Sequence, residues 1–390
     1  MEHWDVVVVG GGPSGAASAA AVRRAAPTAR VLVLDRADFP RDKVCGDGIA
    51  PEALDVLSGL GLDATALTAG YPPVERLRLR SPGGATVERP MHRPASVVPR
   101  EVFDDRLLTA ALATGAELRR HTVRHVAVHP THVDVDGLFR AGAVVGGDGA
   151  ESVVRRALGI APNRPDHLAL AIRGYAPEPA AHAGVQSLLT TAQRWPAYAW
   201  SFPLGGELGG GRANVGYGEL VSAGGTRATL LAGLAELLPD ADPTGLRAHR
   251  LPLSTGRPRQ PDGRVLLAGD AASLINPLTG EGIFYAVLSG ALAGWAALRG
   301  PQAGAAYRRV LERRLARHLR HSALASRVSA RTWVMDAVLR AAAHDQRVFD
   351  DVVALGLADG RLTARTLAAA ASQLIAARRT RTRRPADIDP

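Results

Sequence analysis

A glycine-rich turn near the N-terminus limits the possible folds of this chain more than any other feature. The apolar run Val6–Val9 predicts a strand buried on both faces, and the alanine-rich stretch that follows predicts a helix. Between them, Gly10, Gly12 and Gly15 match the pattern G-x-G-x-x-G. Gly10 permits the sharp turn, Gly12 lets the backbone approach a pyrophosphate, and Gly15 lets the helix pack closely on the strand. The motif predicts a Rossmann-type α/β domain that binds a dinucleotide.

The segment after this helix strengthens that prediction. The stretch "ARVLVLDR" reads as a second strand that ends at Asp35. An acid about twenty residues after the last glycine is where a dinucleotide site places its contact to a ribose hydroxyl. We therefore expect Asp35 and the neighbouring Arg36 to contact the cofactor, together with Pro13 and Ser14 at the start of the helix.

Two later motifs favour FAD over NAD. A strand over 265–268 leads into Gly269 and Asp270, and a turn rich in proline and glycine then precedes a long apolar helix. Asp270 can accept a hydrogen bond from a ribityl hydroxyl, and amides over 280–283 can face the flavin pyrimidine, where negative charge develops on reduction. The middle motif, 146–149, ends another strand before a helix. The cofactor contacts predicted from these motifs are Asp148, Gly149, Gly269, Asp270, Pro277, Gly280, Gly282 and Ile283.

The three motifs, in this order and spacing, resemble the FAD-binding fold of para-hydroxybenzoate hydroxylase. The resemblance extends over residues 1–300. It implies that Arg100, in "VVPREVFDDRLL", lies near the flavin. It also implies that the strand around Val123 flanks the adenine with its backbone.

Two further stretches resemble the geranylgeranyl reductase family. In "FPRDKVCGDGIAPEAL", the Cys45–Gly46 pair matches the family's cysteine and glycine near the flavin ring. The stretch "WPAYAWSFPLGGELGGGRANVGYG" matches its aromatic-x-Trp-x-Phe-Pro strand and the Asn-Val-Gly strand that contains Gly216. Members of this family reduce isolated double bonds in polyprenyl chains on diphosphates, lipids, chlorophyll precursors or quinones. The resemblance implies an FAD-dependent reductase with the same class of substrate.

The aromatic strand predicts a wall of the substrate site. In "YAWSFP", strand alternation places Tyr198, Trp200 and Phe202 on one face and the small residues between them on the other. An aromatic wall beside a flavin could line a tunnel for an isoprenoid chain, and ordinary sheet core is the alternative. We assign the three aromatic residues and Gly216 to substrate binding.

The single cysteine is the candidate catalytic residue. Hydride transfer to an unactivated alkene would leave a carbanion, so an acid must protonate the second carbon. Cys45 could donate that proton or shape the site, because burial in an apolar pocket keeps a thiol protonated. Lys43, the only lysine in the chain, would instead favour the thiolate if it lay close to the sulfur. We therefore expect Lys43 to point away, toward a flavin phosphate or a substrate head group.

The motifs divide the chain into alternating parts of two domains. We predict an α/β fold, with a Rossmann-type FAD-binding domain, an inserted antiparallel-sheet substrate domain and a C-terminal helical region. The FAD-binding domain would comprise 1–70, 99–165 and 254–300, and the substrate domain 71–98 and 166–253. A helical cap would follow over 301–380, and a basic, disordered tail over 381–390.

Charge is concentrated at the C-terminal end. Residues 301–390 carry 17 arginines against 8 acidic residues, out of a net charge of +10 for the whole chain. The helices predicted there could cap the substrate site, contact an anionic membrane surface, or do both. Nucleic-acid binding is not expected because no recognition motif accompanies the charge. The chain has one cysteine, no stretch of transmembrane length and no Cys/His spacing typical of a metal site, which together predict a cytoplasmic protein. The sequence leaves its oligomeric state open.

Several functional alternatives stay open at this stage. The same scaffold supports flavin monooxygenases and, with a Trp-x-Trp-x-Ile-Pro strand, flavin halogenases; a flavin-binding module without activity is a further class. The electron donor could be NADPH, NADH or a ferredoxin, because no second nucleotide fingerprint is visible. The hydrophobic substrate could be a polyprenyl diphosphate, menaquinone, or an isoprenoid or polyketide natural product.

Overall fold

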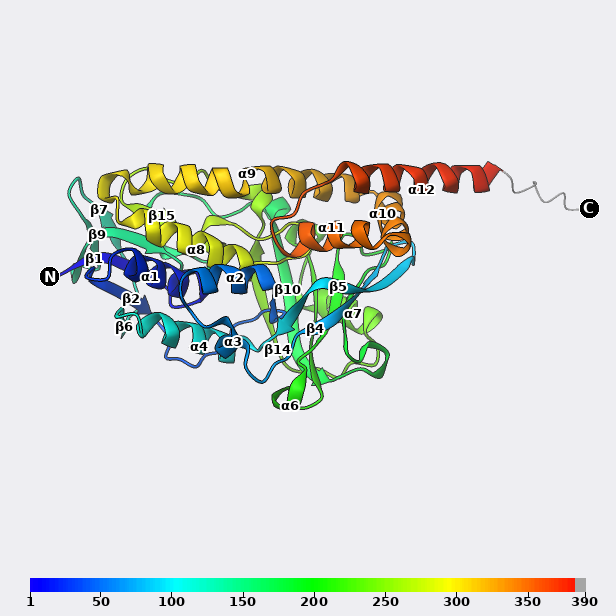
Figure 1. The fold of residues 1–390 in the computed structure, drawn as a ribbon, viewed down its shortest axis with the longest axis horizontal. Helices are drawn as coiled ribbons and strands as arrows, with labels where there is room; N and C mark the ends of the chain where they lie inside the picture. The colour runs from blue at the N-terminus through cyan, green and yellow to red at the C-terminus, as the bar shows by residue number, and fades with distance from the viewer. Residues whose placement is uncertain (383–390) are drawn as a thin grey trace, which may run out of the picture.

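The computed structural model describes residues 1–382 and confirms the predicted fold class (Figure 1). A first sheet carries the Rossmann motifs, with strand order β6-β2-β1-β9-β8-β7 and β15 paired to β9. Strands β6, β2, β1, β9 and β15 are parallel, while β7 and β8 extend the edge in antiparallel fashion. The strands are β1 (Glu2–Val9), β2 (Val31–Asp35), β6 (Glu117–Arg120), β7 (Val126–Val128), β8 (Val133–Val135), β9 (Phe139–Gly146) and β15 (Val265–Leu267).

Glycines hold the two long helices of this domain together. The helices around the sheet are α1 (Pro13–Ala25), α2 (Pro51–Gly59), α3 (Ala64–Thr68), α4 (Arg100–Leu112), α5 (Val153–Ala157) and α8 (Ile283–Ala297). A Cβ atom at Gly290 would lie 2.2 Å from the Ser14 carbonyl oxygen, and one at Gly294 would lie 2.2 Å from that of Ser18. Because these contacts tolerate no side chain, α8 packs directly on α1, and both helices begin at the same cleft.

The second sheet has eight strands in the order β14-β10-β13-β12-β11-β4-β5-β3. It was predicted to be antiparallel, but β11 and β4 pair in parallel, so the sheet is mixed. The two strands belong to separate chain segments with part of the FAD-binding domain between them, and no hairpin fixes their direction. The strands are β3 (Gly48–Ile49), β4 (Val74–Arg80), β5 (Thr86–Val97), β10 (Leu168–Pro177), β11 (Val185–Leu189), β12 (Tyr198–Pro203), β13 (Arg212–Leu220) and β14 (Thr244–Pro252), with helices α6 (Gly206–Gly209) and α7 (Arg227–Leu237).

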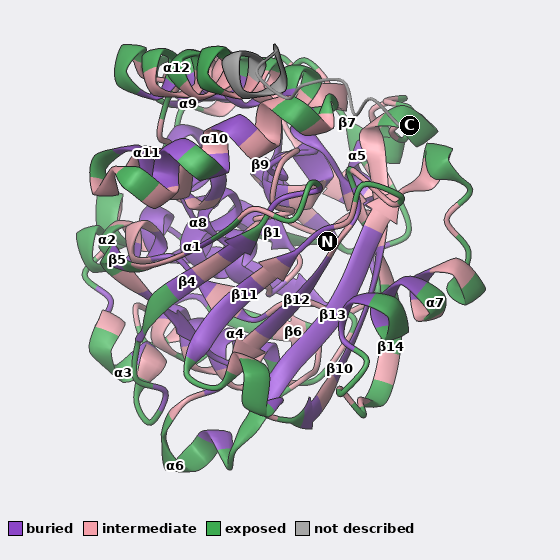
Figure 2. Cartoon of the chain, turned by 90° about the vertical axis from the view of Figure 1, so that its right-hand side faces the viewer, coloured by how far each residue is buried: buried purple, intermediate pink, exposed green. Residues whose placement is uncertain are grey.

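The C-terminal region consists of helices along one edge of the molecule, exposed on their outer side (Figures 1 and 2). They are α9 (Ala303–Ser329), α10 (Thr332–His344), α11 (Gln346–Leu357) and α12 (Ala364–Thr382). Leu339 and Phe349 bury α10 and α11 against Leu77 and Met91 of the second sheet. The predicted tail begins at 381, yet α12 continues to Thr382; the rest of that tail, 383–390, lies outside the described residues. Among residues 1–382, no helix is long and apolar enough to span a bilayer.

Candidate active site

A cavity of about 1140 Å³ runs between the two sheets. The three glycine-rich motifs line one part of it, and aromatic residues of β12 with the C-terminal end of α9 line another. The carboxyl ends of β1, β9 and β15 meet there, as is usual for ligand sites in parallel sheets. The cavity therefore joins a nucleotide-binding region to an aromatic chamber.

The first motif forms an open, uncapped phosphate site. Gly10 has φ +100°, and a Cβ there would lie 2.5 Å from the Gly147 carbonyl oxygen, so only glycine fits this turn. A Cβ at Gly15 would lie 1.7 Å from the Gly10 carbonyl oxygen, which shows the close helix–strand packing expected. Helix α1 has no side-chain cap and no acid in its first turn, so its N-terminal dipole faces the cavity without competition.

The acidic residues of this region are positioned by backbone amides. Asp35 accepts hydrogen bonds from the amides of Gly11 (2.7 Å) and Ala37 (2.9 Å), and each oxygen keeps a lone pair for a ribose hydroxyl. Asp148 accepts from the Val153 amide at 2.7 Å, while its buried Oδ1 has no partner among the described residues. Burial raises the pKa of Asp148. An unpartnered buried oxygen beside open glycine backbone suits a polar cofactor, and these residues fit FAD.

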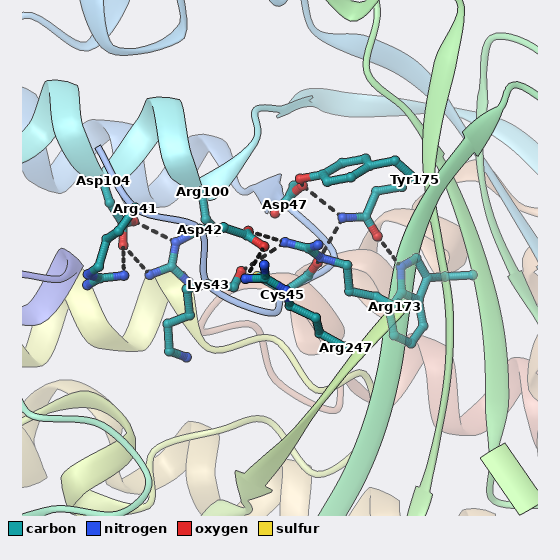
Figure 3. Close-up of polar contacts among 12 residues, drawn as sticks. Arg41, Asp42, Lys43, Cys45, Asp47, Arg100, Asp104, Arg173, Tyr175 and Arg247 are labelled. Atoms are coloured by element: carbon teal, nitrogen blue, oxygen red, sulfur yellow. Dashed lines mark hydrogen bonds and ion pairs between the residues drawn. The ribbon is translucent and has the colours of Figure 1, made fainter. Parts of the chain in front are cut away.

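A buried polar network holds the loop that carries Cys45 (Figure 3). Asn214 of β13 donates to the Cys45 carbonyl oxygen (2.8 Å) and to Asp47 Oδ2 (2.8 Å). Arg173 of β10 donates to the carbonyl oxygens of Lys43 (3.2 Å) and Cys45 (3.3 Å) and forms an ion pair with Asp42. The second sheet thus holds two backbone carbonyl groups of the loop, those of Lys43 and Cys45, in place. Sequence analysis missed these partners, although an arginine inside an apolar strand was a visible signal.

Asp47 occupies a strained position at the centre of this network. Its φ is +62°, which is uncommon for a residue other than glycine, and its side chain is fully buried. The carboxylate accepts from Tyr175 (2.5 Å) and Asn214, and Asn214 in turn accepts from the Trp200 indole N–H at 2.9 Å. Burial raises the pKa of Asp47 to about 6, opposed by Arg173 and these hydrogen bonds.

The Cys45 thiol lies where burial keeps it protonated. Burial raises its pKa, while the charge on Arg100 and a hydrogen bond from the Asp47 backbone amide lower it in part. Arg100 is itself buried and forms a bidentate ion pair with Asp104 at 2.6 and 2.7 Å. Burial alone would lower the pKa of Arg100, but the ion pair outweighs it and raises that pKa. The site therefore combines a neutral thiol with a fixed cation beside it.

Lys43 takes a role that the sequence did not predict. Its ammonium group forms an ion pair with Asp270 Oδ2 at 3.5 Å, a partner that the sequence pattern did not indicate. Its charge is the smallest of the influences on the Cys45 pKa, as expected for a side chain pointing away. His249 lines the same part of the cavity, and its buried Nε2 has no partner among the described residues. Burial, aided by Lys43, lowers the pKa of His249 to about 4, so it is neutral.

The third motif shapes the start of α8. Glu281 accepts a hydrogen bond from the Phe284 amide at 2.8 Å, which caps this helix where amides were predicted to face the flavin. Burial raises the pKa of Glu281 to about 7, opposed by the amides of Phe284 and Ile283. Tyr198 donates to the Thr279 carbonyl oxygen, so β12 also fixes this turn. Sequence analysis did not identify Glu281 as a residue of the site.

The three aromatic residues of β12 all line the cavity: Tyr198, Trp200 and Phe202. Gly216 was predicted to contact the substrate, but it does not line the cavity. A Cβ at Gly216 would lie 2.2 Å from Trp200 Cζ2 and 2.5 Å from the Ile172 carbonyl oxygen. Gly216 therefore makes room for the indole from the adjacent strand. That correction needs the strand register, which the sequence pattern does not give.

Most of the predicted cofactor residues come together at the cavity. Gly15 and Gly269 do not line it and instead permit close packing behind it. Val123 lines it, but from the connection between β6 and β7 rather than from a strand. The residues found at the cavity are Gly10, Gly12, Pro13, Ser14, Asp35, Arg36, Cys45, Gly46, Arg100, Val123, Asp148, Gly149, Asp270, Pro277, Gly280, Gly282 and Ile283.

Comparison with known proteins agrees with this geometry. Residues 3–182 match the model of the FAD binding domain family. The chain is 34% identical over 316 residues to a menaquinone reductase of Mycolicibacterium smegmatis, covering 74% of this chain and 75% of that protein. It is 33% identical over 313 residues to digeranylgeranylglycerophospholipid reductase 1 of Methanopyrus kandleri, covering 75% and 79% of the two chains. The structure of a geranylgeranyl bacteriochlorophyll reductase-like protein of Thermoplasma acidophilum superposes with a TM-score of 0.79 at 20% identity, covering 96% and 97%.

The fold and the site define an FAD-dependent oxidoreductase with a Rossmann-type cofactor domain. FAD is its cofactor. Within that class, the relatives place the chain more narrowly: it belongs to the geranylgeranyl reductase family.

Proposed function

We propose that this enzyme saturates a carbon–carbon double bond in the polyprenyl side chain of a quinone, with menaquinone as the first candidate. The observation that carries the proposal is the position of a half-buried, neutral thiol between the FAD-binding motifs and an aromatic chamber. The menaquinone reductase of Mycolicibacterium smegmatis supports the choice of quinone.

The chamber favours an uncharged chain over a diphosphate. Its walls away from the flavin motifs include Leu188, Trp195, Pro196, Ala330 and Leu357, which are apolar or aromatic. Among the described residues, α9 contributes one charged side chain to this lining, that of Arg327 near the end of the helix. A diphosphate would call for several cations within hydrogen-bonding distance. A polyprenyl chain needs apolar surface along its length, and the chamber offers it.

Reduced FAD, when bound, supplies a hydride to one alkene carbon. The Cys45 thiol gives its proton to the other carbon, so that the substrate gains two hydrogens and two electrons in total. The charge left on sulfur is stabilised by Arg100 and by the Asp47 amide, and solvent later returns the proton. Arg173 and Asn214 hold the loop so that the thiol keeps its place.

Electrons reach the enzyme from a reduced nicotinamide, NADPH or NADH, in this proposal. The donor docks transiently, because the chain carries one dinucleotide fingerprint and FAD fills it. Rapid mixing of the oxidised enzyme with NADPH, NADH or reduced ferredoxin, followed by flavin absorbance, identifies the donor. The same proposal places the enzyme in the cytoplasm, at a membrane surface, with a hydrophobic small molecule and not nucleic acid as its partner.

The central test is anaerobic. The enzyme is photoreduced without oxygen and mixed with menaquinone, geranylgeranyl diphosphate or other polyenes, and flavin reoxidation and product mass are recorded. We expect reoxidation by menaquinone and a product that keeps a gain of two mass units per turnover after air has reoxidised its quinone ring. A flavin that stays reduced until air is admitted, with a product heavier by sixteen, would show a monooxygenase instead.

A further inference from the structure

The second half of α9 presents a continuous basic and apolar stripe to the outside. Its exposed side chains recur at helical spacing, so they share one face of the helix. The stripe consists of Arg317, Arg320, Leu324, Arg327, Val328 and, just past the helix end, Arg331. Helix α9 itself runs along the edge of the molecule that the C-terminal helices form (Figures 1 and 2).

The charge of this stripe is not neutralised within the described part of the chain. No acidic residue occurs from 313 to 335. The guanidinium groups of the four arginines of the stripe form no ion pair or hydrogen bond with any residue from 1 to 382. Two arginines in the first half of α9 do have partners: Arg308 pairs with Asp262 at 2.6 Å, and Arg314 pairs with Asp359. The guanidinium groups of the stripe are therefore available to form ion pairs with anionic groups of another molecule.

Large apolar side chains are interleaved with these arginines. Leu324 is 54% exposed and Val328 38% exposed, and Trp333, at the start of α10, is 50% exposed. Tryptophan prefers the boundary between water and lipid, and arginine pairs with anionic head groups there. The combination is typical of a helix that lies on a lipid surface.

The same two turns of α9 form the end of the substrate chamber. The cavity is lined here by Ala323, Ser326 and Arg327 of α9 and by Ala330, which follows the helix. Trp195, in the segment before β12, lines it as well. The Trp195 indole donates to the Ser329 carbonyl oxygen at 2.6 Å, which ties the chamber wall to this helix end. The stripe therefore borders the apolar end of the cavity.

We propose that this stripe docks the enzyme on an anionic lipid surface, so that a membrane-dissolved polyprenyl chain enters the chamber beside α9. The proposal rests on the proposed function for its substrate but concerns a separate surface. A second copy of the chain is a poorer occupant, because a twofold contact would bring the same unpaired arginines together.

Vesicle binding by the FAD-loaded full chain tests the proposal. We expect co-sedimentation with phosphatidylglycerol vesicles at low salt, weak binding to phosphatidylcholine vesicles, and release by high salt. The double variant Arg320→Ser/Arg327→Ser should bind phosphatidylglycerol about 30-fold more weakly, from the effect of two arginines near an anionic surface. The matched control is Arg124→Ser/Arg227→Ser, which removes two exposed arginines that lie outside α9.

Tryptophan fluorescence gives an independent readout. Docking should shift emission to shorter wavelength in the wild type and in Trp295→Phe, but not in Trp333→Phe. Trp295 is a matched control because it is 40% exposed and lies on α8, under Arg299. The proposal would be overturned if the protein did not bind vesicles, or if both double variants lost the same amount of vesicle binding. It would also be overturned if the protein sedimented as a dimer and substitution of Leu324 dissociated that dimer.

Activity separates this inference from the proposed function. The wild type and Arg320→Ser should saturate the side-chain double bond of a short-chain, water-soluble quinone at the same rate. Saturation of the menaquinone side chain in phosphatidylglycerol vesicles should be slower in the variant. Reduction of both substrates without any vesicle binding would reject the docking surface alone. Vesicle binding without reduction of either would reject the proposed function alone.

Discussion

Replacing Asn214 by leucine should destabilise the protein by about 5 kcal/mol, because this side chain completes the network under the Cys45 loop. Asn214 is fully buried and makes three hydrogen bonds of 2.8 to 2.9 Å. Leucine has a similar volume, so the change removes the polar contacts and leaves little void. The result is a measure of the network rather than of packing.

The magnitude follows from what each partner retains. The Trp200 indole N–H has no other acceptor within residues 1–382 and becomes an unpaired buried donor, which costs about 1–3 kcal/mol. Asp47 keeps its bond from Tyr175 but loses a charge-assisted bond worth about 1.5–3 kcal/mol. The Cys45 carbonyl keeps Arg173, so its loss is small, about 0.5–1.5 kcal/mol.

Urea unfolding of the holoprotein, followed by far-UV circular dichroism at fixed excess FAD, measures the difference. The matched control is Ser201→Ala: Ser201 is also fully buried, but its hydroxyl has no partner among the described residues. Its loss should change the free energy of unfolding by less than about 1 kcal/mol. An Asn214→Leu protein within about 1 kcal/mol of the wild type would refute the argument that this network fixes the loop.

Three further outcomes are expected. Cys45→Ala should bind FAD with an unchanged spectrum but lower kcat by about 10²-fold or more, measured by anaerobic single turnover; full activity would remove the thiol from the proton transfer. Gly216→Ala should displace Trp200 and cost about 1–3 kcal/mol, whereas Gly218→Ala, whose new Cβ would lie 3.4 Å from Ala171 Cβ in ordinary van der Waals contact, should be tolerated in the same unfolding assay. Because the pKa of Asp47 is raised from 3.8 to about 6, its contribution to stability is full below about pH 4 and is lost as pH rises through 6. Between pH 4 and 6, the free energy of unfolding of Asp47→Asn should change by about 3 kcal/mol less than that of the wild type. An equal change in the two proteins would contradict the raised pKa of Asp47.

The cofactor half of the site could be predicted because its signals are local. Gly10, Gly12 and Gly15 act within one turn, and Asp35 follows at the end of the next strand. Each residue has a conformational or electrostatic task that its neighbours in sequence define. The parallel order of the strands then brings the three motifs to one edge of the sheet without further information.

The support for Cys45 could not be predicted in the same way. Asn214 and Asp47 meet across 167 positions of sequence, and Arg173 reaches the loop from 130 positions away. Such contacts depend on the register of β10 and β13 and on the placement of one domain over the other. The register also explains the error at Gly216, since the pairing of Trp200 with Gly216 sets the indole over that backbone.

The division of labour between the two sheets explains why a thiol can serve here. In the proposed reaction the first sheet would hold the hydride source, FAD, while the second sheet, through Arg173 and Asn214, holds the loop that carries the proposed proton donor, Cys45. A hydroxylase on this scaffold would need room for oxygen at the flavin and no acid beside the substrate carbon. A buried thiol is of little use in that reaction, but in alkene reduction it supplies a proton without bringing water into an apolar chamber. The rigid tether of the loop is therefore as much a part of the chemistry as the sulfur, because a proton must arrive at one carbon while hydride arrives at the next.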